Sequence, residues 1–170
     1  VLASSYQNWE LIIVDDVSSD GSVSIAQRYE QKDARIKVYV NEKNLGDYPN
    51  RNKAASYANG KYLKYLDADD IIYPYGLEIM VHTMEQFPEA ALGISQKVAE
   101  DIKPYPFVME PKETFKREFL QRGVLGLGPT GTIIRRDVFE KLGGFTGTRY
   151  IGDTELWYKI ALTYPVVKME

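Results

Sequence analysis

The segment KYLKYLDADDII, Lys61–Ile72, passes from an apolar and aromatic run straight into three aspartates at positions 67, 69 and 70. Carboxylates this close together repel one another. A folded chain keeps such a cluster where the side chains face water or where a cation binds among them. The apolar half predicts a strand, so the aspartates should stand at the carboxyl end of that strand.

A second acidic pair follows an earlier strand. The unbroken apolar run ELIIVDD, Glu10–Asp16, predicts a strand that is buried on both faces and ends in two aspartates. In open α/β sheets, ligands bind at the carboxyl ends of the parallel strands. Two acidic clusters at such ends therefore point to one binding edge.

Predicted strands and helices alternate along the chain. This alternation predicts an α/β fold with a largely parallel central sheet flanked by helices. The Pro-containing stretch Glu100–Glu113 is expected to be a surface loop. Further strands are predicted over residues 34–44, 61–66, 90–98, 132–136 and 165–169, and helices over residues 23–31, 51–60, 75–87, 114–123, 137–145 and 154–164.

Composition narrows the function classes. The chain has 170 residues, enough for one domain, and its formal net charge of -3 gives no overall positive field to attract nucleic acid. It has no cysteine, which excludes disulfides, thiolate metal sites and cysteine nucleophiles. No apolar run approaches the roughly 20 residues of a membrane span. The opening VLASSYQNWELIIVDD resembles the end of a helix leading into a strand, so we expect an earlier strand to precede this sequence.

Three alternatives to a metal site compete for the DADD segment. A calcium-binding EF-hand loop starting at Asp67 would place Glu78 last, but it needs an oxygen ligand at Ile71 and a glycine at Ile72, so we reject it. A phosphoaspartyl transferase would carry threonine where Ile71 stands, which makes that match weak. Asp69 and Asp70 could instead cap the turn that follows, as aspartates often do.

Four motifs, in order, resemble the family 2 glycosyltransferases of GT-A fold, a Rossmann-like architecture. The motifs are NWELIIVDDVSSDGS, NEKNLGDYPNRNKAASYANGKYLKYLDADD, TIIRRDVFEKLGGF and YIGDTELWYKIA. The resemblance covers nearly the whole chain. It implies one domain over residues 1–170, with a nucleotide-binding part at 1–99 and an acceptor-side part at 100–170.

The resemblance assigns nucleotide roles to four residues. Asp16, with Asp15 nearby, would accept a hydrogen bond from the base; the alternative is a cap on the following turn. Arg51 is expected to open a helix, where the macrodipole disfavours a cation, so it would face the nucleotide unless it is simply solvated. Asp67 would contact ribose or metal-bound water.

DADD resembles the family's DxD motif, which implies a divalent cation, Mn²⁺ or Mg²⁺. Asp69 would ligate the ion together with the donor's diphosphate, and Asp67 is the second candidate ligand. Asp70 could instead cap the following turn. A divalent cation would relieve the mutual repulsion of the aspartates.

The last motif implies the acceptor side. Asp153 would be the catalytic base that takes a proton from the acceptor hydroxyl, with Glu155 as runner-up, or it is only an acid at a helix N-terminus. The family usually has an acidic residue before this aspartate, whereas this chain has Gly152. Trp157 would be an acceptor floor or a core residue. The glycine-rich turn containing Gly128 and Thr130 would lie near the acceptor and the donor sugar.

The resemblance implies an inverting, metal-assisted transferase. It would move a sugar from a nucleotide-sugar donor to a saccharide or lipid-linked acceptor, without a nucleic-acid partner. The expected donor is a UDP-sugar. We expect a cytoplasmic location, with peripheral association at the cytoplasmic face of the membrane. One alternative is a nucleotidyl or phosphoryl transferase, which the missing glycine-rich phosphate loop disfavours. The other is a catalytically inactive scaffold of the same fold, which binds sugar or nucleotide.

Overall fold

The computed structural model describes residues 1–95 and 103–169. Its strands are β1 (Leu11–Asp15), β2 (Ile36–Val40), β3 (Tyr62–Leu63), β4 (Leu92–Ser95), β5 (Phe107–Met109), β6 (Thr132–Arg135) and β7 (Val166–Met169). Its helices are α1 (Ser22–Glu30), α2 (Asp47–Ser56), α3 (Gly76–Gln86), α4 (Pro111–Leu120), α5 (Arg136–Lys141) and α6 (Gly152–Ala161), with a 3₁₀ turn at Pro129–Gly131. The predicted α/β class is confirmed.

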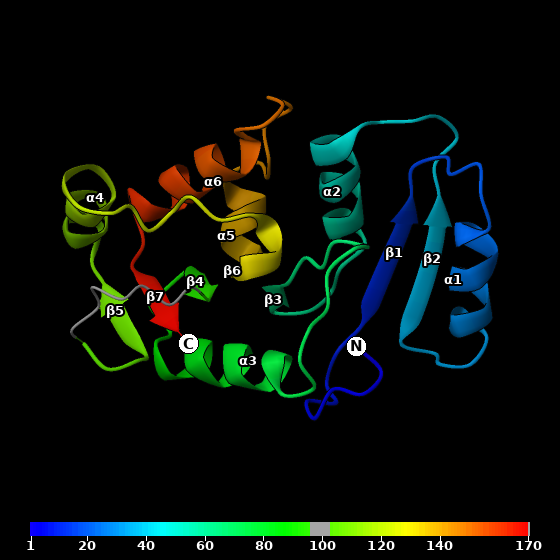
Figure 1. The fold of residues 1–170 in the computed structure, drawn as a ribbon, viewed down its shortest axis with the longest axis horizontal. Helices are drawn as coiled ribbons and strands as arrows, with labels where there is room; N and C mark the ends of the chain where they lie inside the picture. Colours follow the sequence, from blue (N-terminus) through cyan, green and yellow to red (C-terminus); the bar gives the residue numbers. More distant parts are fainter. Residues whose placement is uncertain (96–102, 170) are drawn as a thin grey trace.

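The strands form two sheets (Figure 1). β1 and β2 pair in parallel, with Leu11 opposite Ile36, and α1 connects them as a crossover helix. The larger sheet has the order β3-β6-β4-β7-β5. Within it only β4 and β7 pair in parallel, because β6 and β5 run against their neighbours. The sheet is therefore mixed, where the sequence predicted a largely parallel one.

The larger sheet is buried on both faces. α3 covers one face, and α5 and α6 cover the other (Figure 1). Met84 of α3 packs with Ile133 and Val167, whereas Leu156 and Ile160 of α6 belong to a core that also contains Tyr48 and Leu63. Residues before and after the predicted part boundary at 99 and 100 share this core, although the boundary itself lies outside the described residues. The division into two parts stays a prediction.

Several element boundaries differ from the predictions. The stretch predicted as a surface loop, of which residues 100–102 lie outside the described residues, contains β5 and the start of α4. Pro111 begins α4, where its missing N–H has no partner to lose. The strand predicted over residues 90–98 is described only as far as Ser95, and residues 96–98 lie outside the described part.

α2 begins four residues before the predicted start. Gly46, with a φ of 83°, ends the preceding loop, and Asp47 occupies the first turn, where an acid is favourable. The helix ends at Ser56 because Glu10 accepts hydrogen bonds from the main-chain N–H groups of Asn59 and Gly60 at 2.6 and 2.8 Å. Gly60 therefore lies in a separate turn and does not cap the helix.

Asn52 attaches α2 to the loop that leads to α6. Its side-chain nitrogen donates to the Phe145 carbonyl at 2.8 Å, and its side-chain oxygen accepts from the Phe145 N–H at 2.9 Å. Gly144 has a φ of 70°, and a Cβ there would lie 2.5 Å from the Asn52 oxygen. A glycine at this position thus allows the asparagine to approach the main chain.

We expect Asn52→Ala to lower the free energy of unfolding by about 2 kcal/mol, because the Phe145 N–H and C=O both lose their partner. Urea unfolding measures this change. Asn59→Ala is the matched control, since the Asn59 side-chain amide makes only long contacts of 3.3 and 3.4 Å. Equal stability of the Asn52→Ala protein and wild type would contradict the role given to this contact.

Candidate active site

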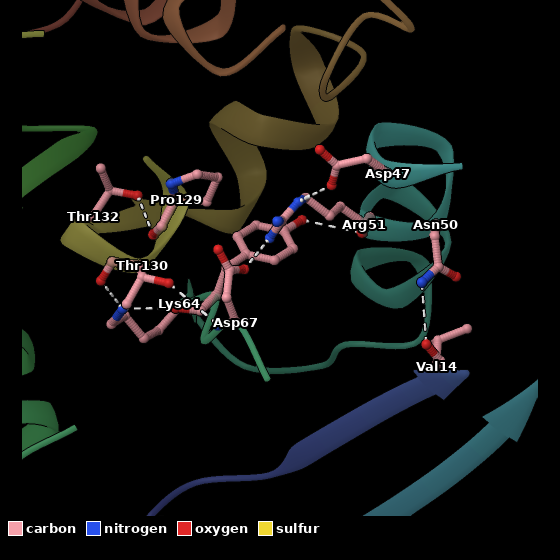
Figure 2. Close-up of polar contacts among 10 residues, drawn as sticks. Val14, Asp47, Asn50, Arg51, Lys64, Asp67, Pro129, Thr130 and Thr132 are labelled. Atoms are coloured by element: carbon pink, nitrogen blue, oxygen red, sulfur yellow. Dashed lines mark hydrogen bonds and ion pairs between the residues drawn. The ribbon is translucent and has the colours of Figure 1, made fainter. Parts of the chain in front are cut away.

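Arg51 and Asp67 form an ion pair between α2 and the loop after β3 (Figure 2). Arg51 Nη1 donates to Asp67 Oδ1 at 2.6 Å, and Arg51 Nε donates to Asp47 Oδ1 at 2.6 Å. Burial alone would lower the pKa of Arg51, but the hydrogen bonds with the two aspartates outweigh it and raise the pKa. Arg51 lies in the second turn of α2 rather than at its start, so the expected conflict with the macrodipole does not arise.

Thr130 and Lys64 hold the other side of the same loop. The main-chain N–H of Asp67 donates to Thr130 Oγ1 at 3.2 Å. Lys64 Nζ donates to the carbonyls of Tyr65 and Thr130 (Figure 2). Burial lowers the pKa of Lys64 to about 8, while the charges of Asp67 and Asp70 oppose that shift. Lys64 is not among the site residues predicted from the sequence, although a lysine inside an apolar run next to three acids was a usable signal.

The carboxylates of Asp69 and Asp70 are exposed and have no hydrogen-bond or ion-pair partner among the described residues. The Asp70 N–H donates to the Asp67 carbonyl at 3.0 Å, which closes a turn, but the Asp70 side chain does not cap α3. Within residues 1–95 and 103–169, no group of three acidic or histidine side chains could hold a metal alone. One or two carboxylates that share an ion with substrate phosphates are typical of Mg²⁺ sites, and this loop fits that pattern.

Asp15 and Asp16 are both used inside the chain. Asp15 accepts from the Ser18 N–H at 2.9 Å, which is the turn-capping alternative. Asp16 accepts three hydrogen bonds at 2.8 Å, from the N–H groups of Leu45 and Gly46 and from the Asn41 amide. Burial raises the pKa of Asp16, but these three bonds together lower it below its usual value. A carboxylate has about four acceptor positions, so one remains for a ligand donor.

Asp153 and Glu155 lie in the first turn of α6. Asp153 Oδ1 accepts from the Thr154 N–H at 2.7 Å. Glu155 is held by the Thr146 hydroxyl and by Lys159, whose Nζ lies 2.9 Å from Glu155 Oε1, and both lower the pKa of Glu155. Because Glu155 is tied up in these contacts, Asp153 is the freer of the two carboxylates.

The residues predicted for the acceptor side differ in exposure. Trp157 is 0% exposed and donates from Nε1 to the Leu127 carbonyl at 2.9 Å, so it is a core residue, as the alternative had it. Gly128 is exposed, its φ is -69°, and a Cβ there would meet nothing within 4 Å. The fold therefore does not require glycine at position 128, and the space above it is open to a ligand.

Two residues with positive φ lie at the end of β1 and just before α6, next to the predicted site residues Asp16 and Asp153. Val17, directly after Asp16, has a φ of 69°, and Tyr150, just before α6, has a φ of 71°. A β-branched residue such as valine, or a bulky one such as tyrosine, is a strained outlier in this region. Such strain clusters at functional sites, so both positions are consistent with a site at the ends of β1 and at the start of α6.

Comparison with known proteins shows which proteins the chain resembles. The sequence profile of the family described as glycosyl transferase family 2 matches residues 1–143. The Escherichia coli UDP-Glc:alpha-D-GlcNAc-diphosphoundecaprenol beta-1,3-glucosyltransferase WfgD is 40% identical over 84 residues, which are 49% of this chain and 32% of WfgD. The chain spans 28% of the length of one curated relative and 58% of another.

Solved structures share the fold. S. aureus TarS in complex with UDP matches with a TM-score of 0.79 at 19% identity, over 98% of this chain and 51% of that one. The Pyrobaculum calidifontis mannosyltransferase PcManGT, in complex with GDP-Man and Mn²⁺, matches with a TM-score of 0.73 at 18% identity, over 98% of this chain and 48% of that one. At these identities the likeness shows the fold, and the predicted GT-A-type fold is confirmed.

The pKa of Asp16 predicts a pH-dependent effect of Asp16→Asn. At pH 7 the variant should unfold about 2 kcal/mol more easily, because an amide nitrogen would face main-chain N–H donors. The lowered folded-state pKa means that the carboxylate stabilises the fold above its unfolded pKa of about 3.9, and that this contribution is lost as the pH falls. The difference between variant and wild type should therefore shrink by pH 3.

Urea unfolding at pH 7 and pH 3 measures the difference. The control is Asp70→Asn, whose exposed carboxylate has no hydrogen-bond or ion-pair partner among the described residues and whose effect should stay within about 0.5 kcal/mol. A difference between Asp16→Asn and wild type that is equal at both pH values would show that the charge of Asp16 does not matter.

Proposed function

The chain belongs to glycosyl transferase family 2, and on that basis we propose that it transfers a sugar from a nucleotide-sugar donor with inversion of the anomeric configuration. The donor we propose is a UDP-sugar. The observation that carries the proposal is the asymmetry of the acidic loop. Asp67 is fixed by Arg51 and Thr130, whereas the exposed carboxylate of Asp69, two residues away, has no partner in the described chain. The loop therefore has a fixed part at Asp67 and an open acidic tip at Asp69.

The fixed part of the loop at Asp67 would bind the nucleoside. Asp67 Oδ1 is bonded to Arg51, which leaves Oδ2 for a ribose hydroxyl. Arg51 is charged and only 21% exposed at its side chain, so it adds positive charge beside an arriving diphosphate. Asp16 keeps one acceptor position for a base N–H. UDP in the TarS complex supports starting with uridine nucleotides.

The open acidic tip at Asp69 would hold a divalent cation. Asp69 is the first ligand, and diphosphate oxygens would complete the coordination. Asp67 Oδ2 is the second candidate ligand, as the alternative to its contact with ribose. When bound, the ion supplies positive charge against the leaving nucleoside diphosphate. The Mn²⁺ in the PcManGT complex supports this assignment.

Asp153 would be the catalytic base. It would take the proton from an acceptor hydroxyl as that oxygen attacks the anomeric carbon and the bond to the nucleoside diphosphate breaks. A single displacement of this kind inverts the anomeric configuration, through a transition state resembling an oxocarbenium ion. The open space above Gly128 is our candidate for the route of the acceptor.

The acceptor would be a saccharide or a lipid-linked saccharide. The name of WfgD specifies a sugar linked to diphosphoundecaprenol, which supports the lipid-linked class. Such an acceptor would bring the protein to the cytoplasmic face of a membrane as a peripheral protein. Among the described residues, no helix is both long and apolar enough to cross a bilayer.

Calorimetric titration with UDP, with and without Mn²⁺, tests the donor site. Wild type should bind UDP more tightly with Mn²⁺, and Asp69→Ala should weaken that binding at least about tenfold, equivalent to ~1.4 kcal/mol. The matched control is Glu89→Gln, since Glu89 is exposed and lies in the turn between α3 and β4, away from the acidic loop. It should bind like wild type.

Other outcomes of this titration separate the alternatives. Binding of GDP or dTDP in place of UDP would keep the mechanism and change the donor. If wild type bound no nucleoside diphosphate in the presence of metal, the transferase proposal would fail. The inactive scaffold of the same fold would then be the better description.

A further inference from the structure

Lys64 is a half-buried cation that the proposed mechanism does not use. It follows directly after β3, and its Nζ donates to the carbonyl oxygen of Tyr65 at 2.6 Å and to that of Thr130 (Figure 2). Thr130 lies 66 residues further along the chain, in the 3₁₀ turn Pro129–Gly131 that leads into β6. One lysine side chain therefore joins the segment before the acidic loop to this turn.

The main-chain pairing between β3 and β6 stops just before this contact. Leu63 and Ile134 are the last antiparallel pair of the two strands. Four residues further in the same register, Asp67 would stand opposite Thr130, and there the Asp67 N–H donates to Thr130 Oγ1 at 3.2 Å. The Thr130 carbonyl accepts from Lys64. Side-chain hydrogen bonds thus replace the strand pairing where the chain enters the acidic loop.

The acidic tip and the open part of the turn flank this contact in the chain. Asp69 is two residues after Asp67, and Gly128 is two residues before Thr130. The space above Gly128 is open, because a Cβ there would meet nothing within 4 Å. In a nucleotide-sugar the sugar is attached directly to the second phosphate. A diphosphate bound through an ion at Asp69 would therefore leave the sugar close to the turn.

An ammonium group can hold the turn firmly in place. It carries three N–H donors on one nitrogen, so Lys64 can bind two carbonyls at once. Among the described residues it makes no ion pair with a carboxylate, and the two carbonyls are its hydrogen-bond partners. A charged group that loses a partner away from water pays a large desolvation cost. The turn therefore cannot move away from Lys64 without leaving this charge unsatisfied.

We propose that Lys64 is a positioning residue that holds the Pro129–Gly131 turn against the acidic loop, and that the turn so held positions the donor sugar. This inference rests on the proposed function, because it assumes that a nucleotide-sugar binds at Asp69. It gives the sugar a contact surface that is separate from the nucleotide contacts of Arg51 and Asp16. Lys64 acts through the turn and not by contact with the substrate.

Calorimetric titration in the presence of Mn²⁺ tests the positioning role. Lys64→Met removes the ammonium group and nearly keeps the length of the side chain. We expect its Kd for UDP to stay within about twofold of wild type, whereas its Kd for UDP-glucose or UDP-GlcNAc, whichever wild type binds, should rise about tenfold. A merely structural loss would weaken the binding of UDP and of the UDP-sugar equally.

Lys61→Met is the matched control. Lys61 is an exposed lysine three residues earlier, and its Nζ binds the two carboxylate oxygens of Glu85 at 2.7 and 2.9 Å. This variant should bind UDP and the UDP-sugar like wild type. Equal effects of Lys64→Met on the two ligands, or no effect on either, would overturn the positioning role.

Amide hydrogen exchange tests the attachment of the turn without a ligand. In wild type the Asp67 N–H should exchange at least about tenfold more slowly than the Asp69 N–H, which has no hydrogen-bond partner among the described residues. Lys64→Met should raise the exchange rate of Asp67 toward that of Asp69, and Lys61→Met should not. Equal rates of Asp67 and Asp69 in wild type, or an Asp67 rate that Lys64→Met leaves unchanged, would overturn the attachment.

The outcomes separate the two levels of inference. If wild type binds both UDP and a UDP-sugar, and Lys64→Met weakens both equally, the positioning role fails and the proposed function stands. If wild type binds no nucleoside diphosphate and no UDP-sugar with Mn²⁺, the proposed function fails and the positioning of a sugar fails with it. The exchange rates still decide whether Lys64 holds the turn.

A second variant covers the case in which Lys64→Met does not fold. Thr130→Val keeps the shape of the side chain and removes the oxygen that accepts from the Asp67 N–H. It should raise the Kd for the UDP-sugar about tenfold and leave that for UDP within about twofold of wild type. Equal weakening of the two ligands would overturn the role given to the turn.

Discussion

The ion pair between Arg51 and Asp67 is the constraint on which the arrangement of the site depends. It joins the middle of α2 to the loop after β3 at 2.6 Å, between side chains that are 21% and 31% exposed. Asp47 holds the same guanidinium from the preceding turn. Arginine can bind two carboxylates at once through its planar fork, which a lysine ammonium cannot reproduce. The acidic loop thereby has one fixed member, and Asp69 is left for a ligand.

α2 carries the other attachments as well. Asn50 donates to the Val14 carbonyl at 3.1 Å and so fixes the end of β1, while Asn52 binds the main chain of Phe145. Tyr48 lies against Gly152 at the start of α6. Because one helix contacts the end of β1, the acidic loop and the start of α6, these parts keep their relative positions without a bound substrate. The proposed transfer between two substrates would require such preorganisation.

Sequence patterns predicted these pieces unevenly. Apolar runs located the described strands other than β5, because burial sets their periodicity, whereas β5 lies in a proline-containing stretch that was predicted to be a loop. Strand direction in the larger sheet did not follow, since it depends on how connections cross the sheet. The partners of Asp16 lie 25 to 30 residues away and could not be read from its own neighbourhood. Trp157 was open between two roles until its packing was known, whereas Gly152 stood out in the sequence but gained a reason only beside Tyr48.

The most direct test of the central claim is a crystal structure of the protein with UDP and Mn²⁺. The account predicts that the Arg51–Asp67 pair stays within hydrogen-bonding distance, with the ion on Asp69 and the diphosphate oxygens beside it. A diphosphate bound away from residues 67–70, or an Asp67 that has left Arg51 to bind the ion with both oxygens, would contradict a preformed donor site built on α2.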